Sequence, residues 1–266
     1  MNRPGIALVA ACAALLTAAG APQAGDYDPM RSALWEDMHT EFLGDGPVKY
    51  DFQVRLIIPR QVEDAFSVPV VIELSDRVQP VEEVVVIAEN NPIQTAARMF
   101  PRREIRSVGM NIRLEQTTPV RAAARDADGV WHVASVRVEV MNPGGCTAAG
   151  GSGSAENPVG TIAMKRFRRP NSATRLKLRI THPMDTGLVT DEDGAVVPAY
   201  YVDTVTLADS AGPIADLVTS AALATNPDFY FDLPDRLQTV RVTASDSKGL
   251  TFDLLEASRR DRDGRT

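Results

Sequence analysis

The sequence predicts an all-β protein of two β-sandwich domains, with a short N-terminal helix and a flexible Gly/Ser linker between the domains. Apolar and polar residues alternate in many short segments, a period of two that is typical of half-buried strands. Turn residues separate these segments at the spacing of a sandwich. The alternation stops near residue 142 and resumes near residue 160. We therefore expect a first domain at 25–142, a linker at 143–159 and a second domain at 160–257.

Residues 1–24 have the features of an export signal. Arg3 supplies a positive start, an apolar run spans residues 6–19, and small residues after it offer cleavage sites. The run is too short to remain as a membrane-spanning helix. We expect a mature protein in the bacterial periplasm that has no membrane segment. Residues 9–12 also resemble a lipoprotein cleavage box, so Cys12 either leaves with the signal or is lipidated.

The composition excludes several classes of function. Without the signal the chain has 27 basic residues against 35 acidic ones, a net charge of −8, which argues against nucleic acid as a partner. Cys12 and Cys146 are the two cysteines, so a disulfide framework is excluded. The three histidines, His39, His132 and His182, do not have the spacing of a metal site. We expect no metal and no cofactor.

The first domain begins with an expected helix. Asp28 can cap it, Pro29 suits its first position, and an apolar residue recurs at every fourth position until Gly44 ends it. The alternating segments that follow predict strands at 48–58, 68–74, 84–88, 111–115, 119–125 and 131–141. Residues 126–129, between the last two strands, form a hairpin signal.

The second domain repeats the strand pattern. We expect strands at 161–167, 175–181, 200–208, 229–233, 239–244 and 250–256, with turns at 191–194 and 246–249. The polar tail at 258–266 is expected to be disordered.

Cys146 is the residue that the sequence singles out for function. It lies between Gly144-Gly145 and Gly150-Gly151, in a segment without large apolar side chains. A structural cysteine is normally buried or paired, so we expect an exposed, mobile thiol. A catalytic nucleophile needs a rigid setting, whereas a covalent carrier needs a thiol that can enter a partner's active site. The alternative is a chance free cysteine in a linker.

Two further features leave alternatives open. His182 and Met184 could form a weak copper-type pair, or could simply shape a turn. Seven basic residues lie within fifteen positions that hold no acid, and they indicate either a solvated strand face or a positive patch near the thiol that would lower its pKa or guide an anionic sulfur group. These residues are Lys165, Arg166, Arg168, Arg169, Arg175, Lys177 and Arg179.

Short motifs in both domains are similar to those of one known family. In the first domain they are residues 88–92 (AENNP), 112–114 (IRL), 138–140 (VEV) and 144–146 (GGC). In the second they are residues 182–188 (HPMDTGL), 198–202 (PAYYV), 226–227 (NP) and 246–249 (DSKG). On these motifs the first domain resembles SoxY and the second resembles SoxZ, the two subunits of the sulfur carrier in bacterial Sox thiosulfate oxidation.

The resemblance implies that both domains are immunoglobulin-like sandwiches packed against each other. It also implies that Cys146, on an arm that includes Gly144 and Gly145, covalently holds sulfur intermediates that Sox-type multihaem cytochromes and a hydrolase load, oxidise and release. The fused chain further resembles SoxYZ-like carriers associated with quinoprotein (PQQ) dehydrogenases, so its cargo need not be thiosulfate sulfur.

One feature departs from the family. The family's arm is a free carboxyl terminus, whereas here the chain continues from Thr147 into the second domain, and a thiol anchored at both ends is expected to reach less far. Two functions follow as alternatives. The first is a carrier without catalytic machinery of its own. The second is a non-covalent accessory or adaptor module for a periplasmic quinoprotein dehydrogenase, in which the thiol is incidental.

Overall fold

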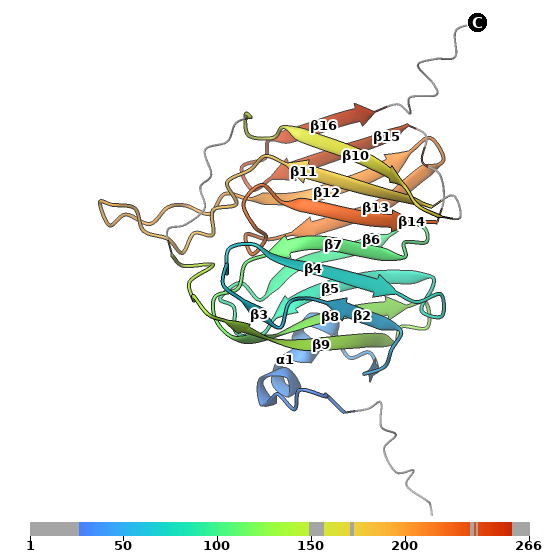
Figure 1. Cartoon of the computed structure of the whole chain (residues 1–266), viewed down its shortest axis with the longest axis horizontal. Helices are drawn as coiled ribbons and strands as arrows, with labels where there is room; N and C mark the ends of the chain where they lie inside the picture. Colours follow the sequence, from blue (N-terminus) through green and yellow to red (C-terminus); the bar gives the residue numbers. More distant parts are fainter. Residues whose placement is uncertain (1–26, 149–156, 171–172, 235–236, 238, 257–266) are drawn as a thin grey trace, which may run out of the picture.

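The computed structural model describes residues 27–148, 157–170, 173–234, 237 and 239–256 (Figure 1). The predicted signal with Cys12, residues 149–156 of the predicted linker and the predicted tail lie outside the described residues. The described chain contains α1 (Ala33–Leu43), β1 (Val48–Lys49), β2 (Val54–Ile57), β3 (Gln61–Val62), β4 (Val68–Leu74), β5 (Val81–Ala88), β6 (Thr95–Pro101), β7 (Ser107–Ile112), β8 (Thr118–Asp126), β9 (Trp131–Val140), β10 (Ile162–Arg168), β11 (Thr174–Ile180), β12 (Val202–Asp209), β13 (Gly212–Thr219), β14 (Asp228–Leu233), β15 (Val240–Asp246) and β16 (Thr251–Glu256).

The strands form two sheets. The ten-stranded sheet has the order β1-β9-β8-β5-β6-β13-β12-β15-β16, with β3 beside β9, and the six-stranded sheet has the order β10-β11-β14-β7-β4-β2. Each sheet runs through both halves of the chain, because β6 pairs with β13 and β7 pairs with β14, both antiparallel. The predicted fold class is confirmed: the chain is mostly strands, with one short N-terminal helix and two sheets consistent with two β-sandwich domains.

One hydrophobic core fills the space between the sheets and continues across the two halves. Phe229 and Phe231 on β14 lie opposite Met110 and Val108 on β7, and all four side chains are buried. Burying side chains of this size contributes about 2 kcal/mol each. The halves are therefore joined by core packing as well as by backbone hydrogen bonds.

The expected strand at 48–58 is wrong, because the chain changes sheets within it. β1 pairs with β9 in the ten-stranded sheet, and β2 pairs with β4 in the six-stranded sheet. Between them the Asp51 carboxylate accepts a hydrogen bond from the Gln53 amide at 3.0 Å, and Phe52 is 98% exposed. Alternation of apolar residues shows that a residue faces a core, but it does not show which sheet carries it.

Three strands were not predicted: the short β3 beside β9, and β6 and β13, which are central. β6 and β13 pair with each other where the halves meet. Their alternation is interrupted by small residues and by charged ones, such as Arg98 on β6 and Asp216 on β13. These charges are satisfied by Glu83 at 2.6 Å and by Arg102 at 2.7 Å. The predicted strand at 111–115 is shifted, because β7 occupies Ser107–Ile112.

Helix α1 covers part of the outer face of the ten-stranded sheet. Trp35, Met38 and Leu43 pack against apolar side chains of β5, β8 and β9, namely Val85, Ile87, Ala123, Trp131 and Val133. The helix starts at Ala33, later than predicted. The Asp28 carboxylate accepts hydrogen bonds from the amides of Met30 and Ser32, which lie before the helix, and so does not cap its first turn. The helix ends at Gly44, as predicted. Among the described residues no helix has the length and apolar character needed to cross a bilayer.

A buried ion network fastens the N-terminal segment to the sheet. Arg121 on β8 has no exposed surface, forms ion pairs with Glu89 and with Asp28 (2.6 Å to Asp28), and lies 4.3 Å from the centre of the Trp35 ring. Its two carboxylate partners are also buried. Such a network stabilises a fold only while every charge keeps its partner.

Replacing Arg121 with Met should therefore lower the free energy of unfolding by about 3–5 kcal/mol, because two buried carboxylates lose their cation. Urea unfolding at neutral pH measures this loss. The matched control is Arg55→Met, which breaks the exposed Arg55–Glu73 pair and should change stability by about 1 kcal/mol or less. Equal losses in the two variants would contradict a structural role for the network.

Candidate functional site

Cys146 lies in a turn six residues after the end of β9. None of its surface is exposed, so the predicted exposed thiol is wrong. The turn is ordered by its own hydrogen bonds: the Ala148 amide donates to the Gly144 carbonyl at 2.9 Å, and the Gly144 amide donates to the Glu115 carbonyl at 2.8 Å. The start of the predicted flexible linker is thus bonded to the first half of the chain.

The two glycines before the cysteine allow a close approach of backbones. Gly144 has φ +111°, a conformation that favours glycine. At Gly145 a Cβ atom would lie 2.3 Å from the Ala65 carbonyl oxygen and 2.4 Å from that of Leu114. Only glycine fits there without a shift of the backbone. The sequence predicted Gly144 and Gly145 as parts of a flexible arm. In the structure they let the backbone of this arm pack against the backbone of Ala65 and Leu114.

The Glu115 carboxylate holds the first-half side of the turn. One oxygen accepts hydrogen bonds from the amides of Cys146 at 3.0 Å and Thr147 at 3.2 Å. The other oxygen accepts the Thr147 hydroxyl at 2.7 Å. Successive amides around one carboxylate oxygen form an anion-binding nest, so the negative charge of Glu115 is placed beside the thiol.

Thr186 holds the turn from the second half of the chain. Its hydroxyl donates to the Cys146 carbonyl at 2.7 Å, and both residues are buried. Thr186 lies in the segment between β11 and β12, within the stretch 182–188 that the sequence singled out as a motif. Cys146 is therefore held at its amide by one half and at its carbonyl by the other.

Arg113 joins the same two halves with a buried guanidinium group. It follows β7 and is 5% exposed. Its donors reach the carbonyls of Gly145 at 3.3 Å and Met184 at 3.2 Å, and the Thr225 hydroxyl at 2.8 Å. A further bond reaches the Leu223 carbonyl at 3.0 Å. A buried arginine is stable only when its donors are satisfied, so these loops are fixed relative to one another.

Burial raises the pKa of the Cys146 thiol to about 12, and the neighbouring Glu115 carboxylate acts in the same direction. The Arg113 guanidinium opposes both effects without cancelling them. With this pKa the thiol is protonated at neutral pH. Because the thiolate is the nucleophilic form of cysteine, the thiol in this buried state, which we call closed, is unreactive. The turn in this state protects the thiol.

Four of the seven basic residues form ion pairs: three lie on β11, and Arg169 lies in the connection between β10 and β11. Asp232 on β14 pairs with Arg175 at 2.5 Å and Arg169 at 4.0 Å, and Asp228 pairs with Arg179 at 2.5 Å and Lys177 at 3.5 Å. These contacts fit the strand-face interpretation. The guanidinium that contacts the Cys146 turn is Arg113, which the sequence analysis did not propose as a site residue.

His182 and Met184 form a buried turn. The Met184 amide donates to His182 Nδ1 at 3.3 Å, and the Met184 sulfur accepts the Val202 amide at 3.4 Å. Burial lowers the pKa of His182, whose Nε2 atom lies 3.7 Å from Asp246. These contacts fit the turn interpretation rather than an open copper pair. Within the described residues, no cluster of three or more His, Cys, Asp or Glu side chains is arranged to hold a metal ion.

The other two histidines make structural contacts. His132 on β9 lies between Asp51 at 2.8 Å and Asp126 at 3.1 Å. His39 on α1 contacts the carbonyl of Trp35 at 3.1 Å. Neither residue belongs to the Cys146 turn.

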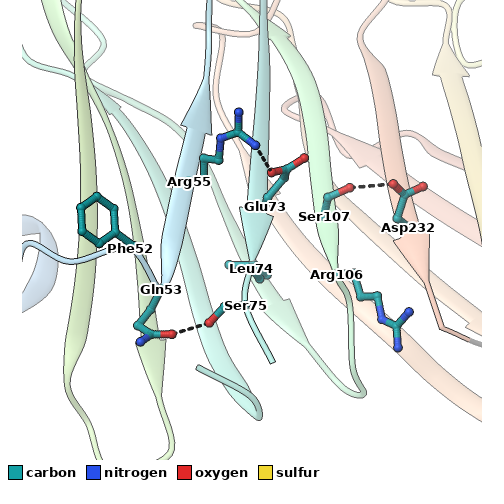
Figure 2. Close-up of a pocket in the computed structure, with 9 residues that line it drawn as sticks. All are labelled: Phe52, Gln53, Arg55, Glu73, Leu74, Ser75, Arg106, Ser107 and Asp232. Carbon is teal, nitrogen blue, oxygen red and sulfur yellow. Dashed lines mark hydrogen bonds and ion pairs between the residues drawn. The ribbon is translucent and has the colours of Figure 1, made fainter. Parts of the chain in front are cut away.

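A shallow cavity of about 390 Å³ lies on the outer face of the six-stranded sheet (Figure 2). Its charged side chains already have partners: Arg55 pairs with Glu73 at 3.0 Å, Arg106 pairs with Glu104 at 3.1 Å, and Asp232 accepts the Ser107 hydroxyl at 2.9 Å. Figure 2 shows Phe52 at its rim. Because the paired groups satisfy one another, we assign no ligand to this cavity.

The sequence analysis proposed Cys146 as the candidate site residue but did not include the three side chains that hold its turn, Arg113, Glu115 and Thr186. Arg113 carries a usable signal, since an arginine between Ile112 and Leu114 interrupts an apolar segment and belongs to a motif that was noted. Glu115 follows two residues later. Thr186 lies 40 positions from Cys146, and nothing in the local sequence links the two.

In comparisons with known proteins, two family models match separate parts of the chain. The family model "Sulfur oxidation protein SoxY" matches residues 39–146, and "Sulphur oxidation protein SoxZ" matches residues 162–254. No curated protein matches the chain. Among solved structures, the chain is similar to the sulfur carrier protein SoxY from Chlorobium limicola f thiosulfatophilum, with 18% identity and a TM-score of 0.35 over 40% of this chain and 96% of that one.

The close packing at Gly145 generates a prediction. Gly145→Ala should lower the free energy of unfolding by about 2 kcal/mol or more, because its methyl group meets two backbone oxygens that cannot move independently. Gly194→Ala is the control: it adds the same methyl group at φ +80° with nothing within 4 Å, and should cost about 1 kcal/mol. Urea unfolding compares the two, and equal losses would show that the Gly145 contacts are not tight.

The raised thiol pKa predicts a pH dependence of stability. The unfolded thiol ionises near pH 9, whereas the folded thiol keeps its proton to about pH 12. The folded state therefore binds one more proton over this range, and the stability that the thiol contributes falls as pH rises above 9. Between pH 8 and 10 the wild type should lose about 1 kcal/mol relative to Cys146→Ala. An unchanged difference in unfolding free energy would contradict the raised pKa.

Proposed function

The chain belongs to the SoxY and SoxZ families, whose domains it joins in tandem, and on that premise we propose that it carries its cargo covalently on the Cys146 thiol. Membership of these families supports a carrier role in sulfur oxidation. The covalent attachment, the periplasmic setting and the partner enzymes are parts of the proposal.

The observation that carries the proposal is the way in which Cys146 is held. Its bonds to Glu115 and Thr186 run through its backbone amide and carbonyl, so the sulfur atom is not committed to either bond. Cys146 is also the last residue of the SoxY match, and the described residues contain no second cysteine with which it could pair. A turn built in this way can release a thiol without breaking the fold.

With thiosulfate as cargo, the loading step is an oxidation. The S–H bond of Cys146 breaks, and a sulfur–sulfur bond forms between Cys146 and the outer sulfur of thiosulfate. One proton passes to solvent, and two electrons pass to a partner redox enzyme of the Sox-cytochrome type. A hydrolase-type partner then adds water to the terminal sulfonate and breaks its bond to sulfur. The sulfonate departs as sulfate, and one additional sulfur atom stays on the cysteine as a persulfide. The chain itself supplies the thiol and no catalytic group.

The proposal includes a closed resting state. A sealed thiol with a pKa of about 12 does not react with stray oxidants in the periplasm, where the signal at residues 1–24 would direct the chain. Loading needs the turn at 144–148 to open, so that water and the partner's active site reach the sulfur. Sox-type enzymes or a quinoprotein dehydrogenase system are the partner classes that we propose.

The burial of Cys146 also favours a second candidate function. A cysteine that stays closed throughout the protein's working cycle would be incidental, and the chain would then act as a non-covalent accessory module of a quinoprotein dehydrogenase. The two functions differ in whether the Cys146 sulfur ever changes its covalent state.

Intact-mass analysis of protein from its native host distinguishes the two functions. The carrier hypothesis predicts a mass adduct that a reductant removes and that is absent from Cys146→Ser. Incubation of the reduced protein with thiosulfate and Sox enzymes should restore the adduct. No adduct under either condition, together with full function and intact partner binding of Cys146→Ser in the host, would instead establish the accessory role.

A further inference from the structure

We propose that Thr186 in the second half is a positioning residue that keeps the Cys146 thiol closed, so that the SoxZ-like half regulates the thiol of the SoxY-like half. The use of this closure in sulfur transfer rests on the proposed function. The closure itself involves no cargo, so it can be tested separately.

The cysteine backbone spans the boundary between the halves. On one side its amide donates to Glu115 at 3.0 Å, and on the other its carbonyl accepts the Thr186 hydroxyl at 2.7 Å. The Thr186 bond is buried, and breaking a buried hydrogen bond leaves a desolvated carbonyl without a partner. Of these two bonds, the Thr186 bond is the one that ties Cys146 to the second half.

Thr186 lies at the neck of a projecting loop. The backbones of Asp185 and Tyr200 exchange two hydrogen bonds, at 2.7 and 3.0 Å, and so close the loop 186–199 at its base. Figure 1 shows this tan segment between β11 and β12 extending away from the sheets. The Thr186 hydroxyl also accepts the Leu188 amide at 3.2 Å. Any movement of the loop base therefore acts directly on the group that holds Cys146.

Arg113 provides a second tie between the same two segments. Its guanidinium bridges the Gly145 carbonyl and the Met184 carbonyl, which lie one residue before Cys146 and two residues before Thr186. The two ties run in parallel between the same pair of segments. The Thr186 tie uses a neutral donor that can be removed without leaving a charge buried, and this makes it the one to test.

The closure controls the chemistry through the fraction of open molecules. In the closed state the thiol is shielded from reagents and protonated, whereas in an open state it meets water and regains an ordinary thiol pKa. The observed rate of any covalent reaction is then the rate of a free thiol multiplied by the open fraction. Weakening the Thr186 bond should raise this fraction without changing the chemistry of the sulfur.

The test measures labelling of Cys146 by Ellman's reagent at pH 8, in the full chain with Cys12→Ser so that a single thiol reports. Thr186→Val keeps the shape of the side chain and removes the donor, and should accelerate labelling about tenfold. Thr186→Ser keeps the hydroxyl and should restore the slow rate. The matched control Thr190→Val makes the same change at an exposed position of the loop and should label as the wild type does.

A second measurement needs no variant at position 186. Labelling of the otherwise wild-type chain is followed in low concentrations of urea, below the unfolding transition. Local opening of the turn exposes little surface, so the labelling rate should depend on urea much less steeply than global unfolding does. A labelling rate that follows the global unfolding equilibrium would overturn the proposal, because the thiol would then be released only with the whole fold.

The remaining outcomes are equally decisive. Thr186→Val labelling at the wild-type rate, or Thr186→Ser labelling as fast as Thr186→Val, would overturn the role of the hydroxyl. A mass adduct in the native host together with unchanged Thr186→Val labelling would leave the carrier function in place and remove the regulation. Accelerated labelling without any adduct would establish the closure and count against the carrier function.

Discussion

The edge-to-edge pairing of the two halves is the constraint on which the rest of the structure depends. The β6–β13 and β7–β14 ladders make both sheets continuous, so the halves share one core and cannot rotate against each other. β7 ends directly before Arg113, and the pairing brings that residue to the carbonyls of Met184 and Leu223. The cysteine turn fits against the same junction. The site is therefore a product of the interface and belongs to neither half alone.

The sequence predicted several strands with one buried face well but missed β6 and β13 at the junction, for a physical reason. β4 and β11 alternate regularly, because one face meets the core and the other is more exposed, and both were found within a residue of their bounds. β6 and β13 lie at the junction, where ion pairs to Glu83 and Arg102 satisfy charges within the strands. Their partners are more than a hundred residues apart in sequence, so local alternation carries no sign of the pairing.

The same limit explains why Cys146 was identified while its burial was not. Burial is usually read from large apolar side chains, and the segment around Cys146 has none. Here it arises from glycine, which lets backbone pack on backbone at Gly145, and from polar groups of Glu115 and Thr186 that arrive from 31 and 40 positions away. A glycine-rich segment can form a mobile arm or a tightly fitted turn. The groups that contact the segment decide which of these two structures forms. Because they lie far away in the sequence, the local residue pattern does not show them.

The second anchor of the arm limits an opened thiol less than the sequence analysis expected. Cys146 lies six residues after the end of β9 and sixteen residues before the start of β10. An extended chain spans about 3.3–3.6 Å per residue, so the maximum span is about 20 Å for the upstream segment and about 55 Å for the downstream segment. The shorter segment sets the reach, and a free carboxyl-terminal arm of the same upstream length would be limited in the same way. Fusion of the halves therefore costs the thiol little reach, and it keeps the Thr186 donor permanently attached to the chain whose thiol it closes.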